Sequence, residues 1–201
     1  DVPTAIDEVM LYKQNGGISL VDATSIGIAR DHLGLSRISQ ATGVNIIMGA
    51  SYYIADSHPV GMDIWTEQDI TAQILLDVTE GVDGTDIRSG VIGEIGCSWP
   101  LTNNERKVLR ASAQAQRMTG APLLIHPGRD EMSPLEIIEI LSEAGADLSR
   151  TIMGHLDRTV FRPETLMEIA QSSCYMEWDL FGTENSYYAL NPNIDMPSDA
   201  K

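Results

Sequence analysis

Three side chains that can ligate a metal recur at nearly even spacing along the chain. Glu94 lies in VIGEIGCS, His126 in LLIHPGR and His155 in IMGHLDR. Each interval is roughly 30 residues, the length of one strand–helix unit. Two imidazoles and a carboxylate suit Zn²⁺ or a similar divalent ion. Such an ion would lower the pKa of a bound water to about 7 and provide a hydroxide nucleophile.

The same spacing leaves a second interpretation open. A histidine at the end of a strand is often a hydrogen-bonded core residue, and the chain contains no HxH or HExxH motif. Under this alternative, the polar strand ends of an α/β domain are structural and hold no metal. Metal analysis of the purified protein separates the two hypotheses.

Four neighbouring residues could act on a substrate. Asp157, two residues beyond His155, could orient that histidine or carry a proton, and its alternative role is to cap the next helix. Arg129 could clamp a carboxylate, sulfonate or phosphate group, or form a surface salt bridge. Tyr52 and Tyr53 end a predicted strand, so one is expected to reach the substrate while the other packs.

Other reactive side chains are weaker candidates. Trp178, Asp179 and Glu184 in MEWDLFGTEN could line a pocket, with packing and loop capping as the alternative. His58 lies in a predicted loop and could line the mouth of a site. Cys97 has no evident base nearby, so a role as a small buried apolar residue is favoured.

The elements that position these residues form a regular series. Six short apolar runs, each continuous rather than alternating, are typical of parallel strands buried on both faces. They cover residues 18–21, 44–48, 91–92, 123–125, 151–153 and 174–176. Helix signals lie between them, including Thr66 and Thr102 as N-caps, Ser133 as an N-cap before Pro134, and a start at Arg162. This alternation predicts a parallel α/β architecture.

The placement of polar residues favours a barrel over a doubly wound sheet. Asp22, Glu94, His126, His155 and Glu177 lie at or just beyond the carboxyl ends of different strands, which is how a (β/α)8 barrel builds its site. A doubly wound sheet commonly shows a glycine-rich turn after its first strand, and no GxGxxG is present.

Composition excludes several classes of function. The 201 residues are 43% hydrophobic, enough for one core, and residues 1–201 are expected to form a single domain. The net charge of −16 argues against binding to nucleic acid or to an anionic membrane surface. No stretch approaches the roughly 20 apolar residues of a membrane span. Two cysteines without a CxxC motif indicate a reducing, cytoplasmic environment.

Five segments closely resemble the phosphotriesterase-related proteins of the amidohydrolase superfamily. They are GVIGEIGCSWPLT, LIHPGRDE, GHLDRT, CYMEWDLFGTE and NIDMP. The resemblance implies a (β/α)8 TIM barrel with a binuclear zinc site and a bridging hydroxide that attacks a carbonyl or phosphoryl centre. By motif, Glu94 matches the bridging carboxylate, His126 and His155 match a two-histidine site, and Asp157 matches a position of a proton relay.

The resemblance also implies a substrate class. It indicates a hydrolase of amide or ester bonds in small N-acetylated compounds such as N-acetyltaurine. The anionic end of such a small-molecule substrate needs a cation, for which Arg129 and Arg158 are candidates, with Tyr53 as a further contact. A homodimer is compatible with the resemblance, since relatives are often dimers.

The chain departs from the family pattern in one respect. It has neither the HxH pair of the first strand nor the strand-end aspartate of the eighth. The six predicted strands therefore match the second to the seventh, and strands 1 and 8 are missing. Two zinc ions are expected per complete chain, with the ligands of one half-site absent here. The alternative is a truncated, inactive fragment that binds one metal or acts only as an interaction partner.

Overall fold

The computed structural model describes residues 1–183 and 188–200 and contains one curved parallel sheet. Its strands follow one another in sequence order, β1-β2-β3-β4-β5-β6, and each pair is parallel. The strands are Ser19–Asp22 (β1), Asn45–Ala50 (β2), Val91–Gly96 (β3), Leu123–His126 (β4), Thr151–Met153 (β5) and Tyr175–Met176 (β6). All six lie where the sequence predicts a strand, within a few residues.

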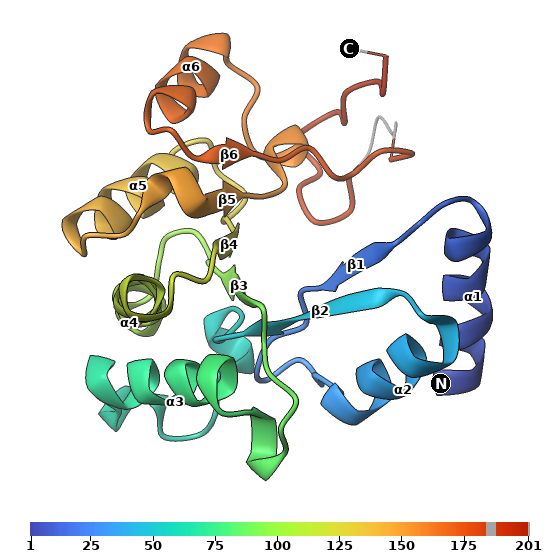
Figure 1. Ribbon diagram of the computed structural model, residues 1–201. Coiled ribbons are helices and arrows are strands. Elements are labelled where there is room, and N and C mark those ends of the chain that lie inside the picture. The colour runs from blue at the N-terminus through green and yellow to red at the C-terminus, as the bar shows by residue number, and fades with distance from the viewer. Residues whose placement is uncertain (184–187, 201) are drawn as a thin grey trace.

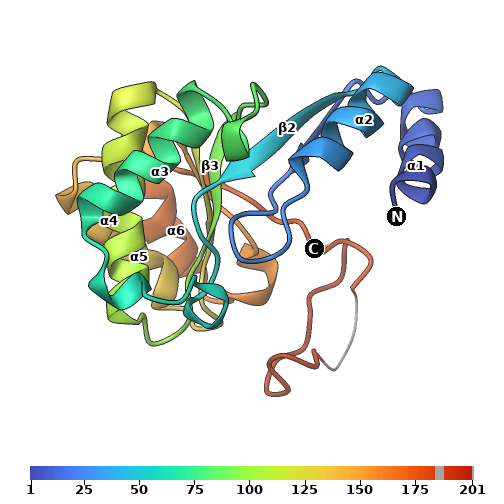
Figure 2. The ribbon, with the colours of Figure 1, turned by 90° about the horizontal axis from the view of Figure 1, so that it is seen from below.

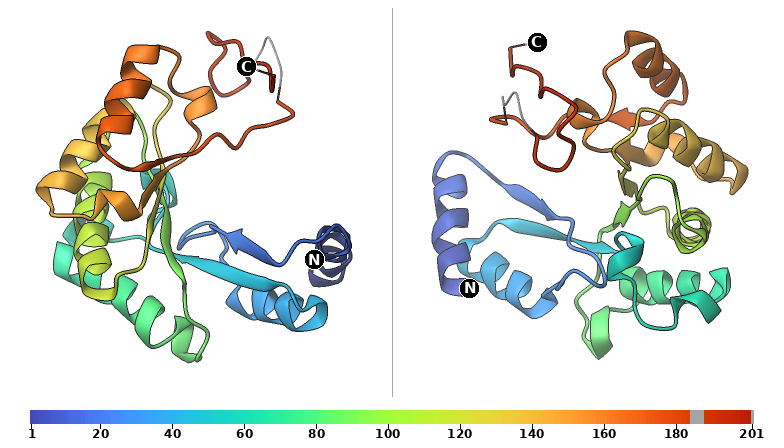
Figure 3. Two further views of the ribbon diagram at one scale, coloured as in Figure 1. Left: turned by 45° about the horizontal axis from the view of Figure 1, so that its top comes forward. Right: turned by 180° about the vertical axis from the view of Figure 1, so that it is seen from behind.

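In the described part of the chain, six α-helices alternate with these strands. They are Val2–Gln14 (α1), His32–Thr42 (α2), Glu67–Thr79 (α3), Asn103–Thr119 (α4), Ser133–Glu143 (α5) and Pro163–Gln171 (α6). The helices α3 to α6 pack in succession against one another on the outer face of the sheet (Figure 1). Figure 2 shows the same layer from below, with α1 and α2 at the far end beside β2. The strands trace an arc rather than a closed ring (Figure 3), which confirms the predicted partial barrel.

The core lies between the sheet and its outer helices. Strand β4 is buried along its whole length, and Leu123 and Ile125 are fully inaccessible to solvent. The apolar runs of β3, β4 and β5 thus correspond to strands that are largely buried on both faces. The same prediction is wrong for β1, β6 and the first half of β2, whose residues are exposed or half-buried because, within the described residues, no further strand or helix covers that part of the sheet. The largest buried apolar side chains around them are Tyr52, Ile70, Ile74, Ile92, Ile95, Leu109, Ile137, Leu141 and Met153.

Two predicted helix starts form complete capping boxes. Thr66 and Asp69 cap α3, and Thr102 and Glu105 cap α4, each pair bonding reciprocally through side chain and backbone. The Glu105 carboxylate is fully buried and also accepts the backbone N–H groups of Ala55 and Ser98 at 3.1 and 3.0 Å. One helix cap therefore fixes the loops that follow β2 and β3.

The predicted start of α5 is wrong in detail. Met132 occupies the N-cap position, and Ser133 is the first helical residue rather than the cap. The hydroxyl of Ser133 instead accepts the backbone N–H of Gly128 at 2.8 Å. The Ser133 hydroxyl therefore bonds the loop after β4 instead of capping the helix, and this bond closes the turn that begins beside His126.

Glu94 lies inside a strand rather than beyond its end. β3 extends to Gly96, and its register against β4 shifts between Ile92 and Ile95, so Gly93 and Glu94 lie in a bulge. Bulges re-aim side chains. Gly93 has φ 146°, and a Cβ there would lie 2.3 Å from the carbonyl oxygen of Leu124. Glycine is therefore required next to the candidate ligand.

Both ends of the sheet are edges within the described residues, because β1 and β6 each pair with one neighbour. The chain continues beyond β6 as irregular segments through residue 200, with 184–187 undescribed. Among the described residues, no helix is both long and apolar enough to cross a membrane.

We expect Gly93→Ala to destabilise the fold by roughly 1–3 kcal/mol, because its Cβ would overlap the backbone of β4. Urea unfolding of the metal-free protein measures the free energy of unfolding. Gly61→Ala is the control, since Gly61 also has positive φ, 91°, but a Cβ there meets no atom within 4 Å. Equal losses in both variants would contradict the steric explanation.

Candidate metal centre

Glu94, His126 and His155 meet at the carboxyl ends of β3, β4 and β5. Glu94 Oε2 lies 3.0 Å from His126 Nδ1, and Glu94 Oε1 lies 2.9 Å from His155 Nε2. The two histidine nitrogens are 2.8 Å apart. One ligand atom from each residue lies within 4.8 Å of the others, which is a set that could hold a metal ion.

The backbone of the neighbouring loop fixes Glu94. Its N–H donates to the Ala23 carbonyl at 2.8 Å, and its carbonyl accepts the Ser25 hydroxyl at 3.0 Å. Both partners belong to the loop that follows β1, and Ser25 is fully buried. The first strand unit therefore holds the bulge that aims the Glu94 carboxylate at the two imidazoles.

His155 has a strained backbone, and a carboxylate orients its side chain. Its backbone adopts the left-handed conformation, φ 56° and ψ 35°, at the start of a short 3-10 helix, Leu156–Arg158. Such conformations are costly for residues other than glycine and cluster at functional sites. The Nδ1 atom lies 2.7 and 2.9 Å from the two carboxylate oxygens of Asp179. This carboxylate leaves Nε2 directed at Glu94 and His126, the arrangement of a histidine that ligates a metal.

The pKa values of the three cluster residues are shifted in different directions. Burial alone would lower the pKa of His155, but hydrogen bonds to Asp179 and Glu94 outweigh it and raise that pKa to about 9. For His126, burial dominates over the attraction of Glu94 and lowers the pKa below its ordinary value. Burial would raise the pKa of Glu94, but the two histidines lower it to about 2. The metal-free cluster thus pairs a carboxylate with one imidazolium.

His126 also contacts Arg158 and Tyr53. Its Nε2 lies 3.2 Å from Arg158 Nη2, and the Tyr53 hydroxyl lies 3.2 Å from Nε2 and 3.3 Å from Nδ1. Tyr53 meets the imidazole edge to face, with ring centroids 4.9 Å apart. Tyr52, its neighbour, is buried in the core, so one of the two predicted tyrosines contacts the site and the other packs.

Arg158 is buried without a carboxylate partner among the described residues. Its guanidinium donates to the Pro127 carbonyl at 3.1 Å and to the Thr159 hydroxyl at 3.0 Å. Burial and the nearby Arg129 lower the pKa of Arg158. Arg129 in turn lies over the Tyr188 ring at 6.0 Å, and its Nε has no hydrogen-bond partner in the described part of the chain. Two guanidiniums therefore lie beside the cluster.

Asp157 does not contact His155 directly. Its Oδ2 accepts the backbone N–H groups of Asp179 and Leu180 at 3.0 and 2.6 Å. The carboxylate thus holds the segment that carries Asp179, which bonds His155. Its Oδ1 is buried and has no partner among the described residues. A proton-relay role stays a prediction, and the structure adds a positioning role.

The remaining candidates lie around this centre. Cys97 is buried with its pKa raised well above the ordinary value, chiefly by desolvation. His58 Nε2 contacts the carbonyl oxygen of Tyr53 at 2.8 Å and so supports the loop that carries Tyr53. Trp178 and Asp157 line a cavity of about 760 Å³. Glu184 lies outside the described residues. The sequence carries no signal for Tyr188, which follows the last strand.

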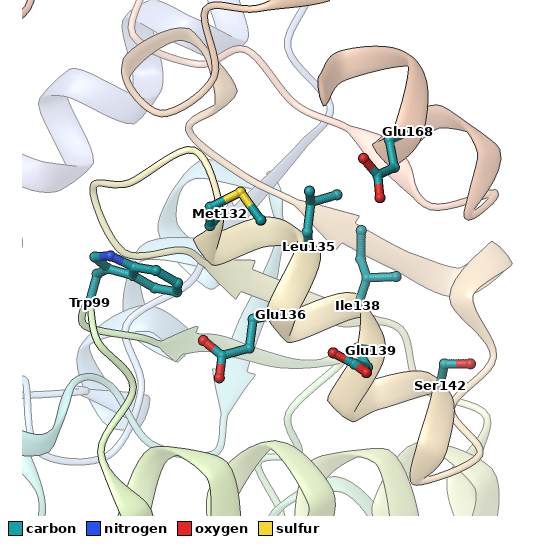
Figure 4. A pocket seen from close by; sticks show the side chains of 8 residues that line it. All are labelled: Trp99, Met132, Leu135, Glu136, Ile138, Glu139, Ser142 and Glu168. Carbon is teal, nitrogen blue, oxygen red and sulfur yellow. The ribbon is translucent and has the colours of Figure 1, made fainter. Parts of the chain in front are cut away.

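A separate groove of about 680 Å³ lies on the outer helical face (Figure 4). Its lining combines apolar and acidic side chains: Trp99, Met132, Leu135, Glu136, Ile138, Glu139, Ser142 and Glu168. None of the candidate ligands or substrate contacts lines it. The groove is therefore distinct from the metal centre.

A partial barrel that brings a carboxylate and two histidines together at its strand ends is typical of α/β barrel proteins with a metal site. Residues 1–198 match the family model described as the phosphotriesterase family. The chain belongs to this family, which confirms the resemblance found in the sequence.

Curated relatives agree with this assignment. The chain is 50% identical over 195 residues to N-acetyltaurine hydrolase of Homo sapiens, which covers 97% of the chain and 56% of that protein. It is 52% identical over 196 residues to the phosphotriesterase-related protein of Nematostella vectensis, covering 98% of the chain and 56% of the relative. The chain thus spans about half the length of the curated relatives it matches.

Two solved structures share the fold. A resiniferatoxin-binding protein from Rhodobacter sphaeroides superposes with a TM-score of 0.92 at 40% identity, covering 99% of the chain and 55% of that structure. The phosphotriesterase homology protein from Escherichia coli, with phosphate in its active site, gives 0.85 at 26% identity. That match covers 94% of the chain and 64% of the bacterial one.

We expect Asp179→Asn to lower the pKa of His155 from about 9 toward its ordinary value of 6.5, because a neutral amide stabilises imidazolium less than a carboxylate does. NMR titration of the metal-free protein measures this pKa. Because folding raises the pKa of His155, its stabilising contribution is complete below pH 6.5 and is lost as pH rises through 9. That loss should be smaller in the variant, and an unchanged titration would contradict the assignment.

A pair of variants separates the two roles of Asp157. Asp157→Ala should lower the pKa of His155, since the segment carrying Asp179 loses both backbone hydrogen bonds to Oδ2. Asp157→Asn should leave it near the wild-type value, because the amide oxygen can still accept both N–H groups. The same NMR titration reports both variants. Equal effects of alanine and asparagine would argue against positioning.

Proposed function

We propose that the protein is a metal-dependent hydrolase that cleaves the amide bond of a small N-acylated anion, with N-acetyltaurine as the foremost candidate. The observation that carries this proposal is the convergence of Glu94, His126 and His155. The curated relatives named N-acetyltaurine hydrolase, which are 50% and 49% identical to the chain, support this choice of substrate. Since the chain spans 56% of their length, the activity is proposed for the complete protein.

The donor set fits a divalent metal. The Asp179 carboxylate bonds His155 Nδ1 and leaves Nε2 facing Glu94, which is how carboxylates commonly orient histidines that ligate a metal. We propose zinc, with two ions per complete chain and the ligands of the second in parts of the relatives that this chain does not cover. A zinc ion supplies an acidified water and polarises a carbonyl oxygen.

The chain's own residues would bind and orient the substrate. N-acetyltaurine carries a sulfonate two carbons from its amide nitrogen, so it needs a cation close to the reacting group. Arg129 and Arg158 lie beside the cluster, and neither has a carboxylate partner among the described residues. Guanidinium matches the geometry of such oxyanions. The Tyr53 hydroxyl, at the edge of His126, offers a further hydrogen bond.

We expect zinc-loaded complete protein to hydrolyse N-acetyltaurine and to lose this activity on chelation, with recovery on adding zinc back. His126→Ala should abolish both zinc retention and turnover, measured by metal analysis and taurine release. Turnover that resists chelation would overturn metal dependence. A protein that retains zinc but leaves N-acetyltaurine intact would overturn the substrate and keep the metal centre.

We expect Arg129→Ala to raise KM for N-acetyltaurine by roughly 10- to 100-fold, the worth of one lost charge-assisted hydrogen bond, with zinc content unchanged. N-ethylacetamide, which lacks the sulfonate, is the matched substrate and should react alike with both proteins. An unchanged KM for N-acetyltaurine, or an equal change for both substrates, would contradict this role of Arg129.

A further inference from the structure

One buried carboxylate in the outer helical layer bonds two of the loops around the metal centre. Glu105 lies in the first turn of α4 and is fully inaccessible to solvent. Its Oε1 accepts the backbone N–H groups of Ala55 and Ser98 at 3.1 and 3.0 Å. Its Oε2 accepts the Ser98 hydroxyl at 2.7 Å and the backbone N–H of Thr102 at 2.8 Å. Four donors from the loops after β2 and β3 therefore converge on one side chain.

Helix capping accounts for only one of these four bonds, the one from Thr102. The capping box of α3 provides a comparison within the same protein. There Asp69 is exposed, and among the described residues its carboxylate bonds only the N–H and the hydroxyl of Thr66. Glu105 is instead buried, where an ionised group is costly unless it is well hydrogen-bonded. Its three further bonds need an explanation beyond the helix.

The first of the two loops carries Tyr53. The Tyr52 carbonyl accepts the N–H of Gly96 at 3.1 Å, and Glu105 holds Ala55 on the other side of Tyr53. A Cβ at Gly96 would lie 2.4 Å from the carbonyl carbon of Tyr53, so this loop lies directly against β3. The backbone on both sides of Tyr53 is therefore fixed, and from it the hydroxyl reaches the cluster.

The second loop supports the segment that carries Arg129. Glu105 holds Ser98 through both its N–H and its hydroxyl. The backbone of Ser98 lies directly against Gly128, where a Cβ would be 2.8 Å from the Ser98 carbonyl oxygen. Arg129 follows Gly128 in the chain, so a displacement of Ser98 would also displace Arg129.

We propose that Glu105 is a positioning residue, which sets Tyr53 and Arg129 at the metal centre from the helical layer outside the sheet. This role rests on the proposed function, in which these two residues contact the substrate. Glu105 acts through the backbones of Ala55 and Ser98. The role requires an ionised carboxylate, because all four partners donate and a protonated carboxyl would add a fifth donor. Burial would raise the pKa of Glu105, but the four hydrogen bonds lower it below its ordinary value.

The contact between Tyr53 and His126 tests this positioning directly. Their rings lie edge to face with centroids 4.9 Å apart, so the metal-free complete protein should show a nuclear Overhauser effect between them. Glu105→Ala should lose this effect. Glu105→Gln should keep it, because the amide oxygen still accepts both N–H groups at Oε1 and the amide nitrogen can donate to the Ser98 hydroxyl.

Thr102→Ala is the matched control. It removes the cap bond from the Glu105 N–H to the Thr102 hydroxyl, and leaves the carboxylate bonded to both loops. The effect between Tyr53 and His126 should therefore persist. Its loss in Thr102→Ala as well, or its persistence in folded Glu105→Ala, would overturn the inference.

Ala55→Pro provides the test if Glu105→Ala fails to fold. Proline removes the one N–H through which this loop bonds Glu105. The backbone accepts its ring, because Ala55 is the first residue of a short 3-10 helix and Ile54 before it is extended, with φ −66° and ψ 158°. This variant should also lose the contact between the two rings, and a contact that persists would overturn the inference.

Kinetics provide a second measurement on the same variants. Glu105→Ala should raise KM for N-acetyltaurine by about 10-fold with zinc content unchanged, since a displaced Arg129 loses one charge-assisted hydrogen bond. KM for N-ethylacetamide, which has no sulfonate, should rise less. Thr102→Ala should leave both KM values unchanged. An equal rise in Glu105→Ala and Thr102→Ala would reduce Glu105 to a helix cap and overturn the inference.

The two measurements separate this inference from the proposed function. A wild type that leaves N-acetyltaurine intact overturns the proposed function, and the contact between Tyr53 and His126 in the variants then decides the positioning role by itself. A wild type that lacks this contact overturns the positioning role, whatever it hydrolyses. A circular dichroism spectrum of each variant confirms that folded proteins are compared.

Discussion

The Glu94 carboxylate is the interaction on which the site depends. Among the side chains that the structure describes, only this carboxylate bonds both histidines, through a different oxygen to each. A buried charge is tolerated only when it is paired and hydrogen-bonded, and here the imidazolium of His155 supplies the pairing. Because the carboxylate comes from a bulge in β3, its direction depends on the backbone of the loop after β1 and on the absence of a side chain at Gly93.

The outer residues of the site act mainly through one another. Asp157 holds the backbone at Asp179, and Asp179 holds His155. On the opposite side, Tyr53 and Arg158 hold His126. The outer nitrogen of His155 bonds a carboxylate, whereas the outer nitrogen of His126 lies beside a guanidinium. The Tyr53 hydroxyl lies close to both nitrogens of His126. The two histidines are therefore not equivalent.

The sequence predicts the positions of the strands well because each contains a continuous apolar run, although only β3, β4 and β5 are largely buried, whereas β1, β6 and the start of β2 are exposed or half-buried. It also places Glu94, His126 and His155 in one region, since consecutive parallel strands share an edge. The sequence did not predict three features of the site: the bulge at Glu94, the hydrogen bond of the Ser133 hydroxyl to a loop, and the hydrogen bond between His155 and Asp179. Each depends on contacts between segments that no local pattern encodes.

The order of the strands has a consequence for how the cluster forms. Neighbouring members are separated along the chain by 32 residues from Glu94 to His126, by 29 to His155 and by 24 to Asp179. Loop-closure entropy grows only slowly with length, and contacts of short separation form early. The three ligands and Asp179 can therefore come together through three successive closures, in the order in which a ribosome delivers them, without waiting for a part of the chain beyond Asp179.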